Sequence, residues 1–188
     1  MLQIVKYQLI GVVPLHQHNG RLANPLDLWS KRIKEVSGKR VKTDADHEEL
    51  FRLEWYGSLY LEDGKPCIPG PCVDATLINA AKKSKKGAQA KAGMLCEANF
   101  PITHDGDEDL EKLWLDERFR FQALMRVGTA KVVRTMPSFF PWSVIIAVSY
   151  NDSLLNAADI DRFVKIGGEQ IGILEGRPRF GRYNAQKL

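Results

Sequence analysis

Arginines that alternate with glycine and aromatic residues form the most chemically distinctive pattern in the chain. The run Gly176-Arg177-Pro178-Arg179-Phe180-Gly181-Arg182-Tyr183 places three guanidinium groups within six residues. A guanidinium binds phosphate through two parallel hydrogen bonds, and glycine lets a backbone amide approach the same phosphate. In a strand, Arg177 and Arg179 would share one face, and Phe180 and Arg182 the other. The run predicts contact with a phosphate chain; a tight turn followed by an ordinary edge strand is the alternative.

Basic and acidic residues are segregated along the rest of the chain. Residues 31–42 contain six basic residues and one acid, and residues 75–96 contain five lysines and no acid. Residues 105–117 contain seven carboxylates and one lysine. The net charge of +4 is modest, but this segregation concentrates positive potential on part of the surface, as polyanion binding requires. The predicted nucleic-acid-binding residues are Lys82, Lys83, Lys85, Lys86, Lys91, Arg134, Arg177, Arg179 and Arg182.

Arg134 is included because it begins a run that also contains Phe139, Phe140 and Trp142. Aromatic rings stack on the bases of single strands when they are exposed. Aromatic residues between prolines are also typical of a protein core, so both interpretations remain open.

His16 and His18 are the candidate catalytic residues. A His-x-His pair can bind zinc or copper, but it would need further ligands from His47, His104 or Asp105, and the spacing does not indicate such a site. One histidine could instead act as general base in metal-independent RNA cleavage, taking the proton of the 2′-hydroxyl. We expect no metal and no cofactor, because the acidic block lacks the calcium-loop pattern and the chain has no Walker phosphate loop.

Apolar periodicity predicts strands and helices that follow one another along the chain. A first strand is predicted over residues 2–13, in preference to a signal peptide, and an aromatic-rich strand over residues 50–61. Further strands are predicted over residues 94–102, 118–127, 131–136, 142–150, 170–174 and 179–183. Helices are predicted over residues 26–36, with Asn24 as cap, over 73–83 and over 154–166, and another begins near Thr43.

This order predicts an α+β fold with a ferredoxin-like (RRM-like) core, in which helices cover one face of an antiparallel sheet and loops are inserted. We expect a single domain over residues 1–188, with a mobile basic loop at residues 82–93 and an acidic loop at residues 104–117. The chain has no run of roughly 18 apolar residues, so no membrane span is expected. Three cysteines without zinc-site spacing favour reduced thiols and a cytoplasmic location.

Two segments resemble a known family. Cys67-Ile68-Pro69-Gly70 precedes a predicted helix, and residues 166–182 form a glycine-rich segment that ends in Phe180-Gly181-Arg182. Together they resemble the RAMP superfamily, the ferredoxin-like RNA-binding proteins of CRISPR effector complexes. In that family an Ile-Pro-Gly turn opens a helix, and a glycine-rich hairpin closes the fold. The resemblance implies a backbone-type subunit of such a complex, or a viral or plasmid relative, that grips a single strand and polymerises along it.

The sequence therefore predicts a non-catalytic protein that binds single-stranded RNA or DNA, with RNA favoured. We expect a homo-oligomer or a subunit of a larger nucleoprotein complex, assembled head-to-tail because its acidic and basic surfaces are unlike. Two alternatives remain open: a metal-independent endoribonuclease that uses a histidine, and a protein-interaction module that inhibits or docks on a nucleic-acid complex.

Overall fold

Alternating apolar residues at the start of the chain form a ten-residue strand, β1 (Leu2–Gly11). Tyr7 and Leu9 are buried on one face, whereas Ile4 and Ile10 are exposed on the other. β1 pairs antiparallel with β10 (Trp142–Asn151) from Leu2 to Ile10. Both strands are confirmed where the sequence predicts them, and their pairing joins segments more than 130 residues apart.

Three further short strands extend this sheet. β11 (Tyr183–Lys187) pairs with the free side of β1, and β5 (Met94–Leu95) pairs with β10. The strand order is β11-β1-β10-β5, and every pairing is antiparallel; β7 (Thr103–His104) also pairs with β10. A separate small sheet contains β3 (Leu61–Glu62), β4 (Lys65–Ile68) and β6 (Phe100–Pro101).

The computed structural model describes the backbone of residues 1–188 and every side chain except those of Arg126, Val127 and Ala130. The chain divides into two compact units. Unit 1 consists of Met1–Leu15, Leu61–Asp105 and Phe139–Leu188, and unit 2 of His16–Tyr60 and Gly106–Ser138. Unit 2 is therefore built from two excursions of the chain away from unit 1.

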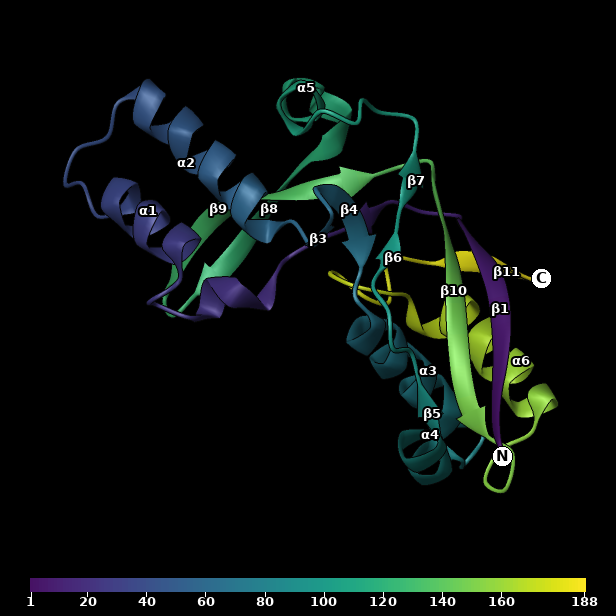
Figure 1. Cartoon of the computed structure of the whole chain (residues 1–188). Helices are drawn as coiled ribbons and strands as arrows, with labels where there is room; N and C mark the ends of the chain where they lie inside the picture. The colour runs from purple at the N-terminus through teal and green to yellow at the C-terminus, as the bar shows by residue number, and fades with distance from the viewer. The chain divides into compact units, whose positions relative to one another are not determined.

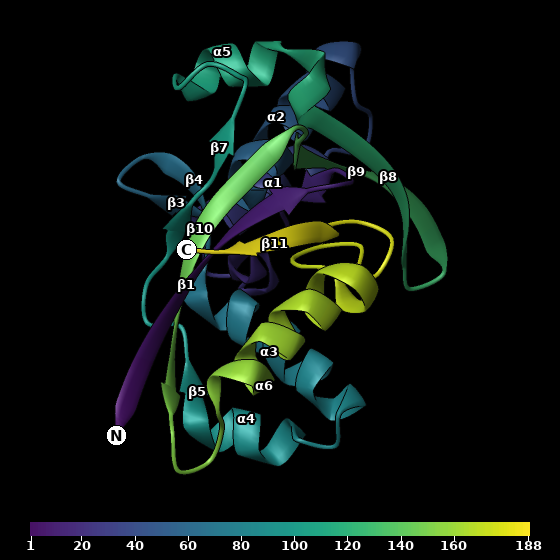
Figure 2. The same ribbon diagram turned by 90° about the vertical axis from the view of Figure 1, so that its right-hand side faces the viewer.

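Helices cover one face of the large sheet in unit 1. α3 (Gly70–Lys83) packs against α6 (Ala157–Ile166), and both lie behind β1 and β10 in Figure 1 and to their right in Figure 2. Leu77 of α3 and Phe163 of α6 are fully buried with Ile146 of β10. Gly70 is the first residue of α3, and glycine is required there because a Cβ would lie 2.1 Å from the carbonyl oxygen of Cys96. The Ile-Pro-Gly segment thus opens a helix, as the sequence predicts.

Unit 2 combines helices with a hairpin. Its helical elements are η1 (Gly20–Ala23), α1 (Leu28–Ser37), α2 (Asp44–Ser58), α5 (Leu110–Leu115) and η2 (Glu117–Phe119). β8 (Arg120–Val127) and β9 (Ala130–Phe139) form the predicted hairpin, and β2 (Leu15–His16) pairs with β9. Trp55 of α2 is completely buried, and its indole N–H donates to the carbonyl of Phe119 at 2.8 Å. This bond ties the longest helix of the unit to the start of the hairpin.

The predicted strand at residues 50–61 is wrong, because these residues complete α2. Thr43 and Asp46 form a reciprocal capping box, in which the Thr43 hydroxyl accepts from the amide of Asp46. This cap starts the helix at Asp44, and the burial of Trp55 outweighs the strand preference of the aromatic residues. α1 begins two residues later than predicted, and Asp27 rather than Asn24 caps it.

The two predicted C-terminal strands are also wrong. α6 continues into a π-helical turn, η3 (Gly167–Ile171), and the following residues form turns until β11 begins at Tyr183. Gly172, Leu174, Gly176 and Gly181 have φ between 61° and 78°, whereas the residues of a regular strand have negative φ. Arg177, Arg179 and Arg182 therefore do not alternate across a strand.

Three other predicted segments also differ from the structure. Residues 94–102 contain only the short strands β5 and β6. Residues 82–93 are not a loop: they form the end of α3 and the helix α4 (Gly87–Gly93), whose alternating alanines favour helix. The acidic segment 104–117 contains α5, which Asp109 caps by accepting from the amide of Glu111.

The architecture is thus a mixed α+β fold with several antiparallel sheets, as the sequence predicts at that level. Across the residues that the structure describes, no helix is both long enough and apolar enough to cross a membrane.

Gly181 provides a test of the C-terminal turns. A Cβ at Gly181 would lie 1.9 Å from the carbonyl oxygen of Ile173, whereas a Cβ at Gly64 would meet nothing within 4 Å, although both have positive φ. Gly64→Ala should lower the free energy of unfolding by about 1–2 kcal/mol, the cost of the left-handed conformation alone. Gly181→Ala should lower it by more than about 3 kcal/mol, because backbone atoms cannot move aside as a side chain does. Urea unfolding followed by circular dichroism measures both, and equal losses would contradict the fixed turn.

Candidate nucleic-acid interface and a polar cavity

The glycine-rich segment of unit 1 is held by hydrogen bonds within the protein. The amide of Gly172 donates to the carbonyl of Gly167, and that of Ile173 donates to the carbonyl of Gly181 at 2.9 Å. The Thr76 hydroxyl of α3 donates to the carbonyl of Gly172 at 3.1 Å. The amide of Gly181 donates to the carbonyl of Pro14 at 2.9 Å. Because the amides of Gly172, Ile173 and Gly181 already donate within the protein, side chains rather than the backbone must contact any phosphate at these positions.

These turns bring residues of distant segments around one hollow. Lys82 and Lys83 from the end of α3, Gln170 and Ile171 from η3, and Arg177 line a shallow hollow of about 590 Å³. The Nζ of Lys82 donates to Asn79 at 2.9 Å, which orients its ammonium group without neutralising it. Among the described residues, no acidic side chain lines this hollow. We call it the basic hollow. It brings Lys82 and Lys83 together with Arg177, which lies about 95 positions later in the sequence.

The remaining predicted lysines of unit 1 do not line the basic hollow. Lys86 forms an ion pair of 2.6 Å with Asp159, whose side chain is only 8% exposed and accepts from the Asn156 amide in the capping box of α6. Lys85 has a φ of 57° in the turn between α3 and α4, and Lys91 is exposed on α4. Lys86 therefore connects α4 with α6, and its charge is matched inside the fold.

Two of the three C-terminal arginines also have roles within unit 1. The Nε of Arg182 donates to the carbonyl of Gly168 at 2.9 Å, which connects β11 with η3. The guanidinium of exposed Arg179 lies over the Phe180 ring, 5.6 Å from its centroid. Arg177 alone faces the basic hollow.

The aromatic run after Arg134 belongs mainly to the core. Phe139 and Trp142 are buried, and the Trp142 indole donates to the carbonyl of Val13 at 2.9 Å. Phe140 is 48% exposed and is the one ring of the three that a base could reach. Arg134 itself lies in unit 2, where it forms an ion pair with Glu54.

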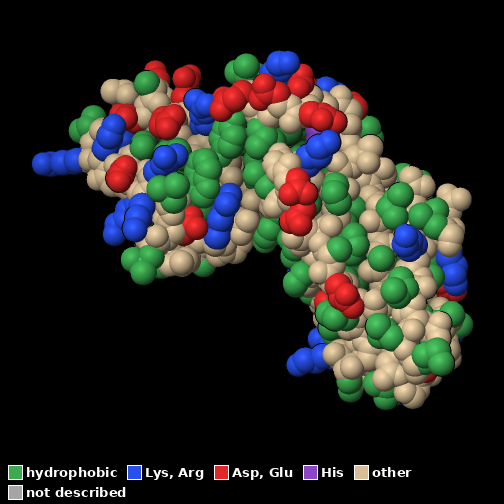
Figure 3. All heavy atoms as spheres, viewed as in Figure 1, with side chains coloured by type: hydrophobic (Ala, Val, Ile, Leu, Met, Phe, Trp, Pro, Cys, Tyr) green, Lys and Arg blue, Asp and Glu red, His purple; other side chains and the backbone are tan. Residues whose placement is uncertain are grey.

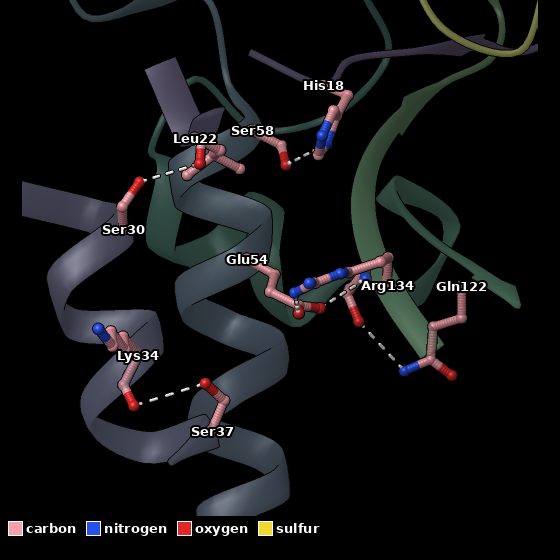
Figure 4. A network of polar contacts seen from close by, with 10 residues as sticks. His18, Leu22, Ser30, Lys34, Ser37, Glu54, Ser58, Gln122 and Arg134 are labelled. Atoms are coloured by element: carbon pink, nitrogen blue, oxygen red, sulfur yellow. Dashed lines mark hydrogen bonds and ion pairs between the residues drawn. The ribbon is translucent and has the colours of Figure 1, made fainter. Parts of the chain in front are cut away.

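Unit 2 contains a polar cavity of about 350 Å³ that the sequence does not reveal. Figure 4 shows its polar side chains: Glu54 and Arg134 point toward each other between α2 and β9, and His18 approaches Ser58 at the end of α2. Glu54 is 3% exposed, and its second carboxylate oxygen accepts from the amide of Thr135 at 2.9 Å. The His18 Nδ1 lies 3.4 Å from the Ser58 hydroxyl. Arg134 and His18 were both predicted as site residues for other roles, whereas Glu54 was not, because glutamate is rarely buried and its pairing with Arg134 has no local sequence pattern.

His16, the other candidate catalytic histidine, is packed into the core. Its side chain is 2% exposed and stacks on Phe121 with ring centroids 3.9 Å apart. Burial lowers the pKa of His16 to about 4, because the core disfavours its charged form. A substrate hydroxyl cannot reach this ring, so of the two candidates only His18 lies at a cavity.

The chain matches no known protein-family model and no curated protein. In the part of the chain whose side chains are described, no group of three His, Cys, Asp or Glu residues could hold a metal ion. The interpretation of the site therefore depends on its geometry and charge.

Burial of His16 predicts a specific dependence of stability on pH. The unfolded chain binds a proton near pH 6.5, whereas the folded protein binds it only near pH 4, so stability is lost as the pH falls through this interval. Between pH 7 and pH 5 this histidine should remove about 2 kcal/mol from the free energy of unfolding, at roughly 1.4 kcal/mol per pKa unit.

His16→Phe keeps a stacking ring but cannot titrate, so its urea unfolding should lack this component of the pH dependence. His47→Gln, which replaces an exposed histidine, is the control and should retain it. An unchanged pH dependence in His16→Phe would show that His16 titrates normally.

Proposed function

We propose that this chain is a single-stranded nucleic-acid-binding protein, RNA being favoured, and that the basic hollow of unit 1 is its phosphate site. The observation that carries this proposal is the convergence of Lys82, Lys83 and Arg177 on one open surface that no acid lines among the residues that the structure describes. Three cations on a surface of this kind attract successive phosphates, and such binding does not depend on base sequence.

The topology of unit 1 supports a ferredoxin-like core, which we include in the proposal. Its elements follow the order β1, α3, β5, β10, α6 and β11, and the antiparallel sheet has the order β11-β1-β10-β5. This is a split βαβ arrangement repeated twice. Together with the two segments that resemble the RAMP superfamily, it favours a backbone-like subunit of a nucleoprotein complex.

The open face of the sheet is less suited to binding a nucleic-acid strand than the helix side of unit 1 is. On the face away from the helices, Ile4 is 64% and Ile145 is 55% exposed. The outward positions of β1 and β10 carry aliphatic and small polar residues with a single cation, Lys6, and no aromatic ring. Bases bind to open sheets by stacking on aromatic rings. We therefore propose that the nucleic-acid strand binds on the helix side, at the basic hollow.

Arg177→Gln tests the phosphate site, with Lys6→Gln as the matched control. Both changes remove one positive charge from unit 1, but only Arg177 lines the basic hollow. Arg177→Gln should weaken binding to a labelled oligouridylate about fivefold, the upper range for one exposed ion pair. The slope of log K against log salt should become less negative by roughly 0.7, which corresponds to one phosphate contact on a single strand.

Fluorescence anisotropy across a salt series measures both quantities, and a parallel DNA oligonucleotide distinguishes the two nucleic acids. Equal effects of the two substitutions would place binding elsewhere. Binding that does not respond to salt would favour the protein-interaction module, and shortened RNA on a gel would favour the endoribonuclease.

We also propose that copies assemble head-to-tail along the strand. Acidic side chains gather over α5 and the residues before it, as Figure 3 shows, and Asp107, Glu108 and Asp109 are all exposed there. This acidic surface belongs to unit 2, whereas the basic hollow belongs to unit 1. A contact between unlike surfaces leaves one surface of each kind unpaired at the two ends of an open array, so further copies can add along a strand.

The triple change Asp107→Asn, Glu108→Gln and Asp109→Asn tests assembly without removing helix caps. Asp107 and Asp109 accept amide hydrogen bonds, and asparagine accepts them equally well. The change should lower binding cooperativity on a long oligonucleotide but leave affinity for a short one nearly unchanged. Glu48→Gln with Glu49→Gln, exposed on α2, is the control. Sedimentation velocity gives the stoichiometry, and one protein per strand at every oligonucleotide length would contradict head-to-tail assembly.

A further inference from the structure

The polar cavity of unit 2 has the size of a small-molecule site. Its volume of about 350 Å³ lies in the range of roughly 300–1,000 Å³ typical of such sites. α1, α2 and the β8–β9 hairpin all contribute residues to its wall. Much of the wall is apolar, with Leu22, Ile33 and Met125 among its members, so it can receive a compact apolar body.

Glu54, the acidic residue of this cavity, already accepts hydrogen bonds through both of its carboxylate oxygens. Glu54 accepts from the guanidinium of Arg134 through one oxygen and from the amide of Thr135 through the other. These bonds fix the Arg134 guanidinium at the wall, where Glu54 is its only hydrogen-bond partner among the described residues. A guanidinium carries five N–H donors, so most of its donor capacity remains for a ligand.

The charge of the wall favours an anion. Among the residues whose side chains are described, its cations are Lys34 and Arg134, and its one carboxylate is Glu54. Lys34 is exposed on α1, and Figure 4 shows it on the side of the cavity away from Arg134. The Ser58 hydroxyl and the His18 ring provide neutral polar groups at the end of α2. The net charge of the lining is therefore positive, beside an apolar surface.

We propose that this cavity binds a small organic anion. The guanidinium of Arg134 donates to the oxyanion group, Lys34 across the cavity adds to the positive potential, and the apolar body packs on Leu22, Ile33 and Met125. Either a carboxylate or a phosphate monoester provides this chemistry, since both accept charge-assisted hydrogen bonds from a guanidinium. The site lies entirely in unit 2, so this inference does not depend on the basic hollow of unit 1.

Methyl NMR of the full chain labelled at the methionine methyl groups tests the proposal. Of the four methionines, only Met125 lines the cavity. Phenylacetate and phenyl phosphate are the probes, and each should shift the Met125 resonance saturably while leaving that of Met94, in unit 1, unchanged. Phenylacetamide lacks the charge and acetate lacks the apolar body, so each should bind at least about tenfold more weakly than phenylacetate.

Lys34→Gln should weaken phenylacetate binding about fivefold, because one of the cations that attract the anion is removed. Lys31→Gln, which changes another exposed lysine of α1 that does not line the cavity, is the control. Arg177→Gln should bind phenylacetate normally, which separates this site from the nucleic-acid site. No saturable shift of Met125, equal binding of phenylacetamide, or equal effects of Lys34→Gln and Lys31→Gln would each overturn the proposal. A preference between the two probes identifies the oxyanion as carboxylate or phosphate.

Discussion

The antiparallel pairing of β1 with β10 is the constraint on which the rest of the structure depends. It joins residues 2–10 to residues 143–151 through backbone hydrogen bonds, and the burial of Leu9, Val144 and Ile146 on the helix side accompanies it. Once this pair has formed, the chain must leave the sheet after β1 and return to it before β10 ends the connection; β5 and β7 are parts of that connection that pair with β10. The sequence between them contributes helices and strands to unit 1 and both excursions that make unit 2. Bringing together two strands more than 130 residues apart costs chain entropy. The burial of Leu9, Val144 and Ile146 helps to offset that cost.

The glycine-rich turns depend on the same pair. β11 adds to the free edge of β1, which returns the C-terminal segment to the sheet after α6. Gly168 packs against the backbone of Tyr183, and any side chain there would lie 2.1 Å from the Tyr183 carbonyl oxygen. The close approach of η3 to β11 thus requires glycine at this position. It also leaves Gln170, Ile171 and Arg177 beside the end of α3, so the basic hollow is a consequence of how the sheet is completed.

The sequence predicted the parts of the fold in which local pattern and tertiary packing agree. β1 and β10 alternate clearly, α3 follows a Pro-Gly pair, and α6 has an asparagine cap. The predicted helix start near Thr43 is confirmed by the capping box of α2, but residues 50–58 were wrongly predicted as strand, because their aromatic residues favour strand. The two predicted C-terminal strands were wrong, because a run of glycines does not reveal which of them adopt positive φ, and the structure contains instead the alternative of tight turns followed by an edge strand, β11.

The two candidate sites differ in how far the sequence could indicate them. Lys82, Lys83 and Arg177 were each predicted, since clustered basic residues are visible in a sequence, but their convergence arises from the packing of η3 on α3. The polar cavity could not be predicted, because its residues come from separate segments and its central acid, Glu54, is buried against the usual tendency of glutamate. Glu54 and Arg134 form an ion pair only because β9 lies beside α2. No local sequence pattern encodes that position.

The physical difference between the two sites also indicates what each can discriminate. In the basic hollow the nearby glycine amides are bonded within the protein, so recognition depends on exposed charges that are screened by salt and do not distinguish one base from another. In the cavity of unit 2, Glu54 holds the Arg134 guanidinium in a fixed orientation beside an apolar wall. A fixed donor next to a surface of defined shape discriminates by both charge and size, because a ligand that fails either requirement leaves a buried group without a partner. The basic hollow is thus suited to a long, repetitive polyanion, and the cavity to one compact anion.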